Sequence, residues 1–133
     1  MKKTVKLYKQ SHSKSCSMFA AWPGIGDVSL MAARYLKEEL KAVEIGEIEP
    51  LSFFEPVGVM VENDVVEAPR FPESKFYYWQ DDKTERGLLL FIGEAQPSSK
   101  GYELASCVLD VAQKFKVERL YSCAAAVTQI HHS

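Results

Sequence analysis

Long apolar runs, paired cysteines and an excess of charge of one sign are all scarce in this sequence of 133 residues. No apolar stretch is long enough to cross a membrane as a helix. None follows Lys2 and Lys3 as the apolar core of a secretory signal peptide would. We therefore expect a cytoplasmic protein.

The few cysteines and histidines do not form a recognisable site. Cys16, Cys107 and Cys123 are odd in number and lack Cys-x-x-Cys spacing, which predicts neither a disulfide framework nor a zinc site. Each lies in an apolar run, where a free cysteine usually acts as a small buried hydrophobe. His131 and His132 are adjacent and would point to opposite faces of a strand, so we expect no metal site. No histidine is placed to activate a cysteine in a recognisable motif, so we expect no cysteine nucleophile.

The net charge of −2 predicts no general attraction to nucleic acid. One local exception is the beginning of the chain, where Lys2, Lys3, Lys6, Lys9 and Lys14 precede any acidic residue. Lysines on an edge strand discourage the addition of another strand, which is one interpretation. The alternative is an RNA-binding arm, which ordinarily contains more arginine and interleaved aromatic residues.

What the sequence does contain is enough for one folded domain over residues 1–133. Hydrophobic residues make up 47% and charged residues 26%, which is ordinary for a protein with a packed core. Two segments, 27–41 and 102–116, show the 3.6-residue apolar rhythm of amphipathic helices, with Asp27 as the N-cap of the first. Apolar runs predict strands at 16–22, 43–48, 88–92 and about 120–127, a hairpin at 57–67, and an antiparallel strand at 75–80 that ends in a charged turn at 81–86.

Helices of this length suit the crossovers that join parallel strands. The sequence therefore predicts an α/β fold, with a mostly parallel sheet covered by helices and an inserted antiparallel hairpin. Ligands of such sheets bind at the carboxyl ends of the strands. Two loops occupy that position, residues 22–27 and 93–99.

The first loop contains Gly24-x-Gly26 between a strand and a helix, as in a nucleotide-binding turn. Ser29 stands at the third glycine position, and Asp27 puts a negative charge where a phosphate would meet the helix. We interpret both glycines as structural and keep an anion or nucleotide site, formed with Gly93 and Glu94, as the alternative. No Walker A lysine motif is present.

Glu94 follows the central strand, where a general acid or base could stand. It lacks a carboxylate or histidine partner in its own motif, so we expect it to cap or hydrogen-bond the neighbouring loop. Aromatic residues gather in the middle of the chain and belong either to the core or to a partner-binding surface. For that surface the candidates are Phe76, Tyr77, Tyr78 and Trp79.

The order of these motifs resembles the PAC2 (proteasome assembly chaperone 2-like) family, whose archaeal and bacterial members are often labelled ATP-grasp superfamily. The resemblance rests on Trp22-Pro23-Gly24-Ile25-Gly26-Asp27-Val28, Ile48-Glu49-Pro50, Gly93-Glu94-Ala95-Gln96-Pro97 and Gly101-Tyr102-Glu103. It implies a three-layer α/β/α fold similar to nucleoside phosphorylases and assembly into oligomers. Eukaryotic members act as chaperones in building the proteasome α-ring.

Three departures from the family pattern accompany the resemblance. Family members usually continue past Ser133, so the chain looks like the N-terminal part of the usual domain. Residues 123–126, Cys-Ala-Ala-Ala, stand where relatives tend to be glycine-rich. The last residues, 130–133, do not form the hydrophobic-Tyr-X tail with which some archaeal members dock on the proteasome, so we do not expect docking by that route.

These observations together predict a non-enzymatic assembly or binding protein, without a cofactor, that contacts a protein partner or itself as a homo-oligomer. The alternative is a small-molecule-binding protein or hydrolase related to the nucleoside phosphorylases. The absence of a nucleophile and acid–base set favours the first interpretation.

Overall fold

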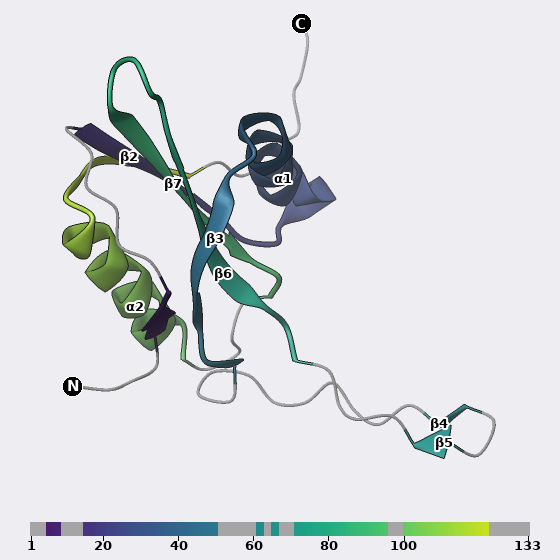
Figure 1. Cartoon of the computed structure of the whole chain (residues 1–133). Helices are drawn as coiled ribbons and strands as arrows, with labels where there is room; N and C mark the ends of the chain where they lie inside the picture. Colours follow the sequence, from purple (N-terminus) through teal and green to yellow (C-terminus); the bar gives the residue numbers. More distant parts are fainter. Residues whose placement is uncertain are drawn as a thin grey trace, which may run out of the picture.

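A computed structural model describes residues 5–8, 15–50, 61–62, 65–66, 71–95 and 100–122. The main body is a six-stranded sheet with the strand order β1-β3-β6-β7-β2-β8 (Figure 1). A separate antiparallel pair is formed by β4 and β5. The elements are β1 (Val5–Leu7), β2 (Ser15–Ala21), a 3-10 turn η1 (Ile25–Asp27), α1 (Val28–Leu40), β3 (Val43–Ile48), β4 (Val61–Glu62), β5 (Val65–Val66), β6 (Ser74–Gln80), β7 (Arg86–Gly93), α2 (Gly101–Lys114) and β8 (Val117–Tyr121).

Most of the predicted elements are confirmed. Both helices are present, the second predicted strand has the bounds of β3, and the central strand 88–92 lies within β7. The predicted hairpin corresponds to β4 and β5, although its turn at 63–64 lies outside the described residues. Lys6 lies on β1, which is an edge strand as the run of lysines predicted.

The prediction of a mostly parallel sheet is wrong. The pairings β1–β3, β3–β6 and β6–β7 are antiparallel, and only β7–β2 and β2–β8 are parallel. The reason is the position of β6, which pairs with both β3 and β7 instead of belonging to an insert. Because the charged turn at 81–85 is short, β6 and β7 can only be antiparallel neighbours.

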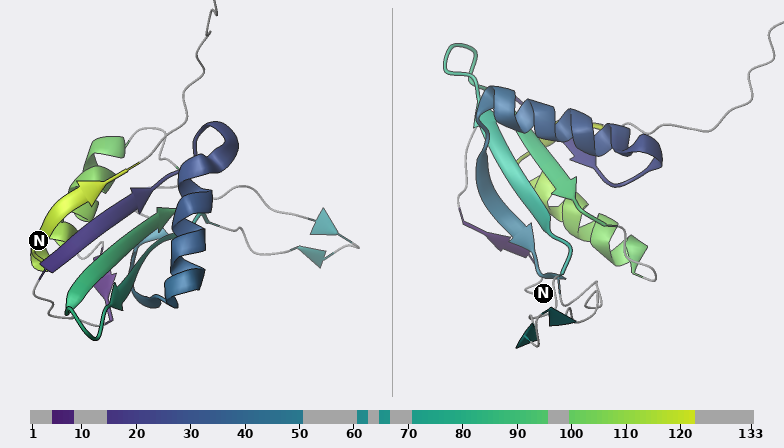
Figure 2. Two further views of the ribbon diagram at one scale, coloured as in Figure 1. Left: turned by 90° about the horizontal axis from the view of Figure 1, so that it is seen from above. Right: turned by 90° about the vertical axis from the view of Figure 1, so that its right-hand side faces the viewer.

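Each face of the sheet carries one helix (Figure 2). Along β7, Leu89 and Phe91 belong to the core under α2, whereas Leu90 and Ile92 belong to the core under α1. This alternation follows from the two-residue period of a strand, and it explains why β7 is almost continuously apolar. Neither helix of the described chain is long and apolar enough to cross a membrane.

The strand β8 begins earlier than predicted, at Val117. It lies at the edge of the sheet beside β2, and its residues from Glu118 to Tyr121 are exposed. Leu120 and Tyr121 fall within the predicted strand, while its remainder, from 123 to 127, lies outside the described residues. The parallel half of the sheet therefore ends in an exposed edge.

Candidate functional site

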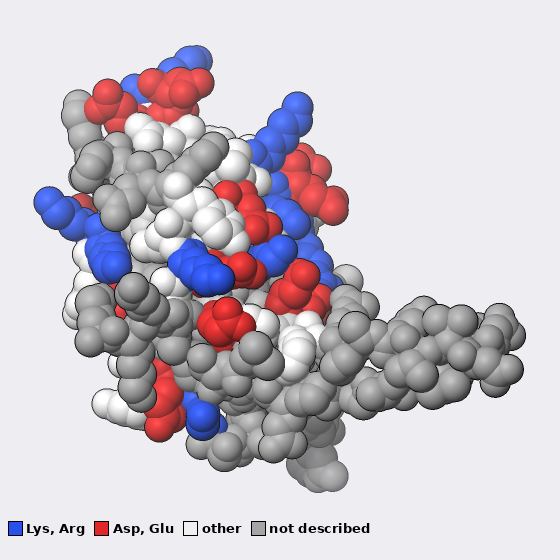
Figure 3. Space-filling view, turned by 60° about the horizontal axis from the view of Figure 1, so that its bottom comes forward, with Lys and Arg blue, Asp and Glu red and all other residues white. Residues whose placement is uncertain are grey.

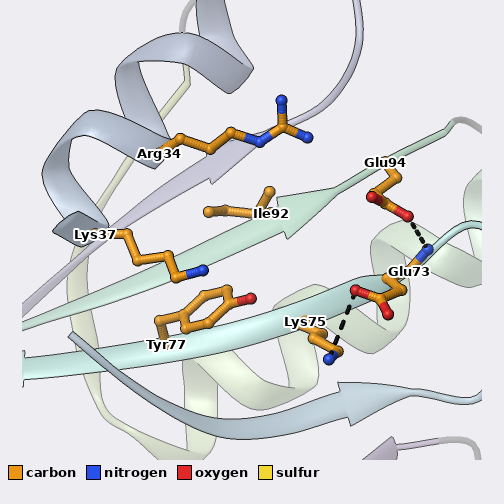
Figure 4. A pocket seen from close by; sticks show the side chains of 7 residues that line it. All are labelled: Arg34, Lys37, Glu73, Lys75, Tyr77, Ile92 and Glu94. Atoms are coloured by element: carbon orange, nitrogen blue, oxygen red, sulfur yellow. Dashed lines mark hydrogen bonds and ion pairs between the residues drawn. The ribbon is translucent and has the colours of Figure 1, made fainter. Parts of the chain in front are cut away.

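A pocket of about 130 Å³ lies between α1 and the ends of β6 and β7 (Figure 4). Its walls are mostly charged, and the side chain of Ile92 forms an apolar part of its surface. The lining residues are Arg34, Lys37, Glu73, Lys75, Tyr77, Ile92 and Glu94.

The α1 wall of the pocket is basic. Arg34 and Lys37 are three residues apart on the helix and so lie on one side of it. Lys37 Nζ lies 4.4 Å from the centre of the Tyr77 ring, an arrangement that attracts a cation to the face of the ring. Neither Arg34 nor Lys37 forms an ion pair within the described part of the chain. Both cations are therefore available to a negatively charged group.

On the opposite wall of the pocket, Lys75 forms ion pairs with neighbouring carboxylates. Lys75 Nζ lies 3.2 Å from Glu44 Oε1 and 3.5 Å from Glu73 Oε2. The hydrogen bond with Glu44 stabilises the ammonium form and raises the pKa of Lys75 above its ordinary value, against the opposing effect of burial. Lys75 therefore stays charged and links β6 to β3 across this face of the sheet.

Glu94 forms hydrogen bonds with the backbone of Glu73, the residue before β6. Its Oε1 accepts a hydrogen bond from the Glu73 amide at 2.8 Å, and its own amide donates to the Glu73 carbonyl at 2.8 Å. These bonds continue the β6–β7 pairing one step past the strand ends. The role predicted for Glu94, a hydrogen bond to the neighbouring loop, is the one that the structure shows.

The candidate ligand residues of the first loop lie apart from this pocket. None of Gly24, Gly26 and Asp27 lines it. Gly26 has φ +66°, a conformation that favours glycine, which supports the structural interpretation. Asp27 precedes α1 as predicted, but its side chain makes no capping hydrogen bond. Gly93 meets the Trp22 ring, and a side chain at this position would crowd it.

Three of the four aromatic residues predicted as a partner surface are in the core. Phe76, Tyr77 and Tyr78 are buried, and only Trp79 is half-buried. The reason is that β6 lies in the middle of the sheet, with strands on both sides and a helix over each face. These three residues do not form an exposed surface of the folded chain.

The basic wall of the pocket, formed by Arg34 and Lys37, was not predicted from the sequence. Charged residues of an amphipathic helix are ordinarily solvated, so Arg34 and Lys37 individually carry no distinct signal in the sequence. The signal that could have found them is their three-residue spacing next to the apolar positions of α1. Figure 3 shows acidic and basic side chains interleaved on one face of the molecule. Within the described ranges, no group of three His, Cys, Asp or Glu side chains could hold a metal ion.

Comparisons with known proteins give a consistent result. The family model described as PAC2 family matches residues 18–133. PbaB of Pyrococcus furiosus, an archaeal proteasome activator, is 30% identical over 97% of this chain, with a TM-score of 0.74. A PAC2 family protein from Streptomyces avermitilis is 19% identical over 86% of this chain, with a TM-score of 0.66.

A proteasome-assembly chaperone homologue from Mycobacterium tuberculosis is 20% identical over 80% of this chain, with a TM-score of 0.65. The chain spans about half the length of these proteins: 54%, 51% and 48%, respectively. A search of curated proteins found no match.

Proposed function

Because this chain belongs to the PAC2 family, we propose that it is a non-enzymatic assembly protein that acts by binding another protein. The observation that carries the proposal is the similarity to PbaB, which extends over 97% of the chain. Since the chain spans only 54% of PbaB, the activity of the whole relative is proposed for this protein and not assigned to it. The proposed partner is the proteasome.

The arrangement of charges in the pocket supports binding more than catalysis. Lys75, Glu73 and Glu94 are engaged in ion pairs or backbone hydrogen bonds that hold β3, β6 and β7 together. The two carboxylates beside Arg34 and Lys37 are those of Glu73 and Glu94, which make these contacts, and none of the described residues that line the pocket is a serine, threonine, cysteine or histidine. Asp27, exposed before α1, opposes a phosphate at that helix and so argues against the nucleotide-binding alternative.

Three finer expectations remain part of the proposal. The three-layer α/β/α architecture is supported by the helices on opposite faces of the sheet. Self-association is supported by the exposed edge at β8. A cytoplasmic location stays a prediction.

The proposal is tested with the proteasome core particle of Pyrococcus furiosus, since the similar activator comes from that organism. Hydrolysis of a fluorogenic peptide is measured with the particle alone, with this protein and with PbaB as the positive control. Co-elution in size-exclusion chromatography reports binding independently of activity. We expect co-elution, with or without stimulation. Neither effect, under conditions in which PbaB stimulates the particle, would remove the proteasome as the partner.

A further inference from the structure

The two cations that line the pocket continue the side of α1 that faces the sheet. Leu30 and Ala33 are buried against the sheet. Arg34 lies one helical turn after Leu30, and Lys37 lies one turn after Ala33. The inner stripe of a helix that covers a sheet is ordinarily apolar, so two cations in this stripe are unusual. Lys37 is half-buried, with its ammonium over the Tyr77 ring, and Arg34 is exposed.

The carboxylates of the pocket already have partners of their own. Glu73 pairs with Lys75, and Glu94 accepts a hydrogen bond from the Glu73 amide. Arg34 and Lys37, by contrast, make no ion pair within the described ranges. Figure 4 shows these two cations extending from α1 and the two carboxylates at the far ends of β6 and β7. A small anion that enters beside α1 would therefore meet positive charge first.

The size of the pocket limits what can enter. Its volume is about 130 Å³. Cavities of roughly 150 Å³ hold a group of the size of benzene, whereas sites for larger cofactors and drug-like molecules measure about 300–1,000 Å³. The pocket is therefore matched to a small ion or to a single functional group, and it is too small for a whole nucleotide.

The remaining residues of the pocket favour a carboxylate over a phosphate or sulfate. Ile92 contributes apolar surface, which the methylene beside a carboxylate can cover and an inorganic anion cannot. Glu73 and Glu94 repel any anion in the pocket, and they repel a dianion about twice as strongly as a monoanion. A group with one negative charge and a short apolar stem satisfies both conditions.

We propose that this pocket binds one carboxylate group on a short aliphatic stem. The carboxylate lies between Arg34 and Lys37, and the stem lies against Ile92. Arginine suits this role, because its planar guanidinium matches the two oxygens of a carboxylate. Such a group occurs as the side chain of an acidic residue in a protein partner and in small free carboxylic acids. The inference goes beyond the proposed function, since it concerns the chemistry of the pocket and not the identity of the partner.

The test follows the isoleucine methyl signals of the wild-type protein by NMR. Ile92 reports on the pocket and is identified by its loss in Ile92→Val, while Ile48, buried under α2, is the internal control. The ligands are propionate, its neutral counterpart propionamide, and sulfate, which all have the same number of heavy atoms. We expect saturable movement of the Ile92 signal with propionate, and about tenfold weaker binding of propionamide and of sulfate.

A pair of blocked tripeptides, Ala-Glu-Ala and Ala-Gln-Ala, distinguishes the two sources of the carboxylate. If the pocket takes the side chain of a protein partner, the glutamate peptide binds at least as tightly as propionate and the glutamine peptide does not bind. If it takes a free acid, propionate binds and neither peptide does, because the peptide backbone does not fit beside α1. Either result supports a carboxylate site.

Variants of the protein test the two cations. Arg34→Gln and Lys37→Gln should each weaken propionate by about fivefold, because each removes one positive charge from the site. Lys114→Gln is the matched control, since it removes one charge from an exposed position at the end of α2, and it should change the affinity by less than about twofold. Glu94→Gln keeps the acceptor for the Glu73 amide and removes a negative charge, so it should reduce the discrimination against sulfate. Circular dichroism checks that each variant is folded.

Four results would overturn the inference. They are no saturable movement of the Ile92 signal with propionate, equal affinity for propionate and propionamide, binding of sulfate at least as tight as that of propionate, and a loss in Lys114→Gln as large as in Lys37→Gln. The outcome is separate from that of the proteasome experiment. A core particle that ignores the protein while propionate binds the pocket removes that partner and leaves the carboxylate site in place.

Discussion

Tyr78 shows how one residue of β6 is committed to the core. Its side chain is 7% exposed, its ring centre lies 5.7 Å from that of Phe115, and its hydroxyl donates to Gln80 Oε1 at 3.2 Å. The next residue, Trp79, points to the other face of the sheet and is half-buried. A charged substitution at Tyr78 therefore disturbs the core, whereas the same substitution at Trp79 affects a side chain that is only half-buried.

Tyr78→Glu should destabilise the fold and not merely dissociate a complex. It removes a buried ring and places a carboxylate among apolar side chains, so we expect a loss of about 3–5 kcal/mol in the free energy of unfolding. Trp79→Glu serves as the control, with an expected loss of roughly 1 kcal/mol. Urea denaturation followed by circular dichroism measures both. Equal losses in the two variants would contradict the different burial of the two side chains.

Lys75 gives a prediction about pH. The hydrogen bond with Glu44 raises the pKa of Lys75 in the folded chain. A raised pKa means that the contribution of Lys75 to stability is complete below the pKa of the unfolded chain, about 10.4, and is lost as pH rises through the folded value. The wild type should therefore lose stability in alkali.

Lys75→Met isolates this effect, because the other groups of the chain titrate in both proteins. The stability advantage of the wild type over Lys75→Met should be largest near neutral pH. It should shrink above about pH 10.4, the ordinary lysine pKa. Chemical denaturation at pH 7 and pH 11.5 measures the difference. An advantage that grows between these two values would show that the charged form of Lys75 is not the stabilising one.

At the scale of the element, the end of α1 has a defined cap. The Ala42 amide donates to the Lys37 carbonyl at 3.0 Å, and the Lys41 amide donates to the Glu38 carbonyl at 3.3 Å. This is the hydrogen-bond pattern of a Schellman motif. Lys41 adopts φ +54°, a left-handed conformation that glycine reaches without a steric penalty.

Lys41→Gly should therefore stabilise the protein, by about 1 kcal/mol. Lys41→Ala is the control, since it removes the same charge but keeps the side-chain carbon that opposes this conformation. Thermal unfolding should rank Lys41→Gly above both the wild type and Lys41→Ala. A lower melting temperature for Lys41→Gly would mean that the charge of Lys41 outweighs its backbone strain.

Elements were predictable where their signal is local. Short apolar runs located β3 and β7, and the 3.6-residue apolar period located both helices, because each signal depends only on residues near in sequence. The order of the strands depends on pairings between distant segments. Thus the pattern of Lys75–Gln80 gave its strand and its antiparallel partnering, but not its place between β3 and β7. The seven residues of β6 do not by themselves determine its place in the sheet, because that place depends on pairing with distant strands.

The candidate site was predictable to a similar extent. The hydrogen-bonding role of Glu94 followed from its place after the central strand. The pocket could not be predicted in this way, because it is lined by Arg34 and Lys37 of α1 together with Lys75 and Tyr77, which follow much later in the chain. A cation on a helix surface looks the same in sequence whether it faces solvent or a cavity.

For the whole molecule, the exposed edge at β8 bears on self-association. Leu120 and Tyr121 are 48% and 49% exposed there. A parallel strand is ordinarily covered on both faces. The oligomer predicted from the sequence is therefore expected to form its contact at β8, because the buried residues of β6 do not offer one.

Static light scattering at micromolar concentration should accordingly give the mass of a dimer, the commonest closed assembly. Tyr121→Glu should shift the mass towards that of one chain, because it places a charge in the contact. Met31→Asp on α1 is the control and should leave the mass unchanged. A wild type that is folded and monomeric would refute the prediction. A dimer that survives Tyr121→Glu would place the contact on another surface.

The position of β2 between β7 and β8 has a consequence for synthesis. On the ribosome β2 emerges early, but Cys16 pairs with Gly87 on one side and Val117 on the other. At roughly 5–20 residues per second, this apolar strand waits several seconds for its first neighbour. The hairpin of β6 and β7 can form as soon as it emerges, and β2 can then dock onto it. During that delay the nascent chain exposes an unpaired strand. We therefore expect that a molecular chaperone would help this proposed assembly protein to fold during its own synthesis.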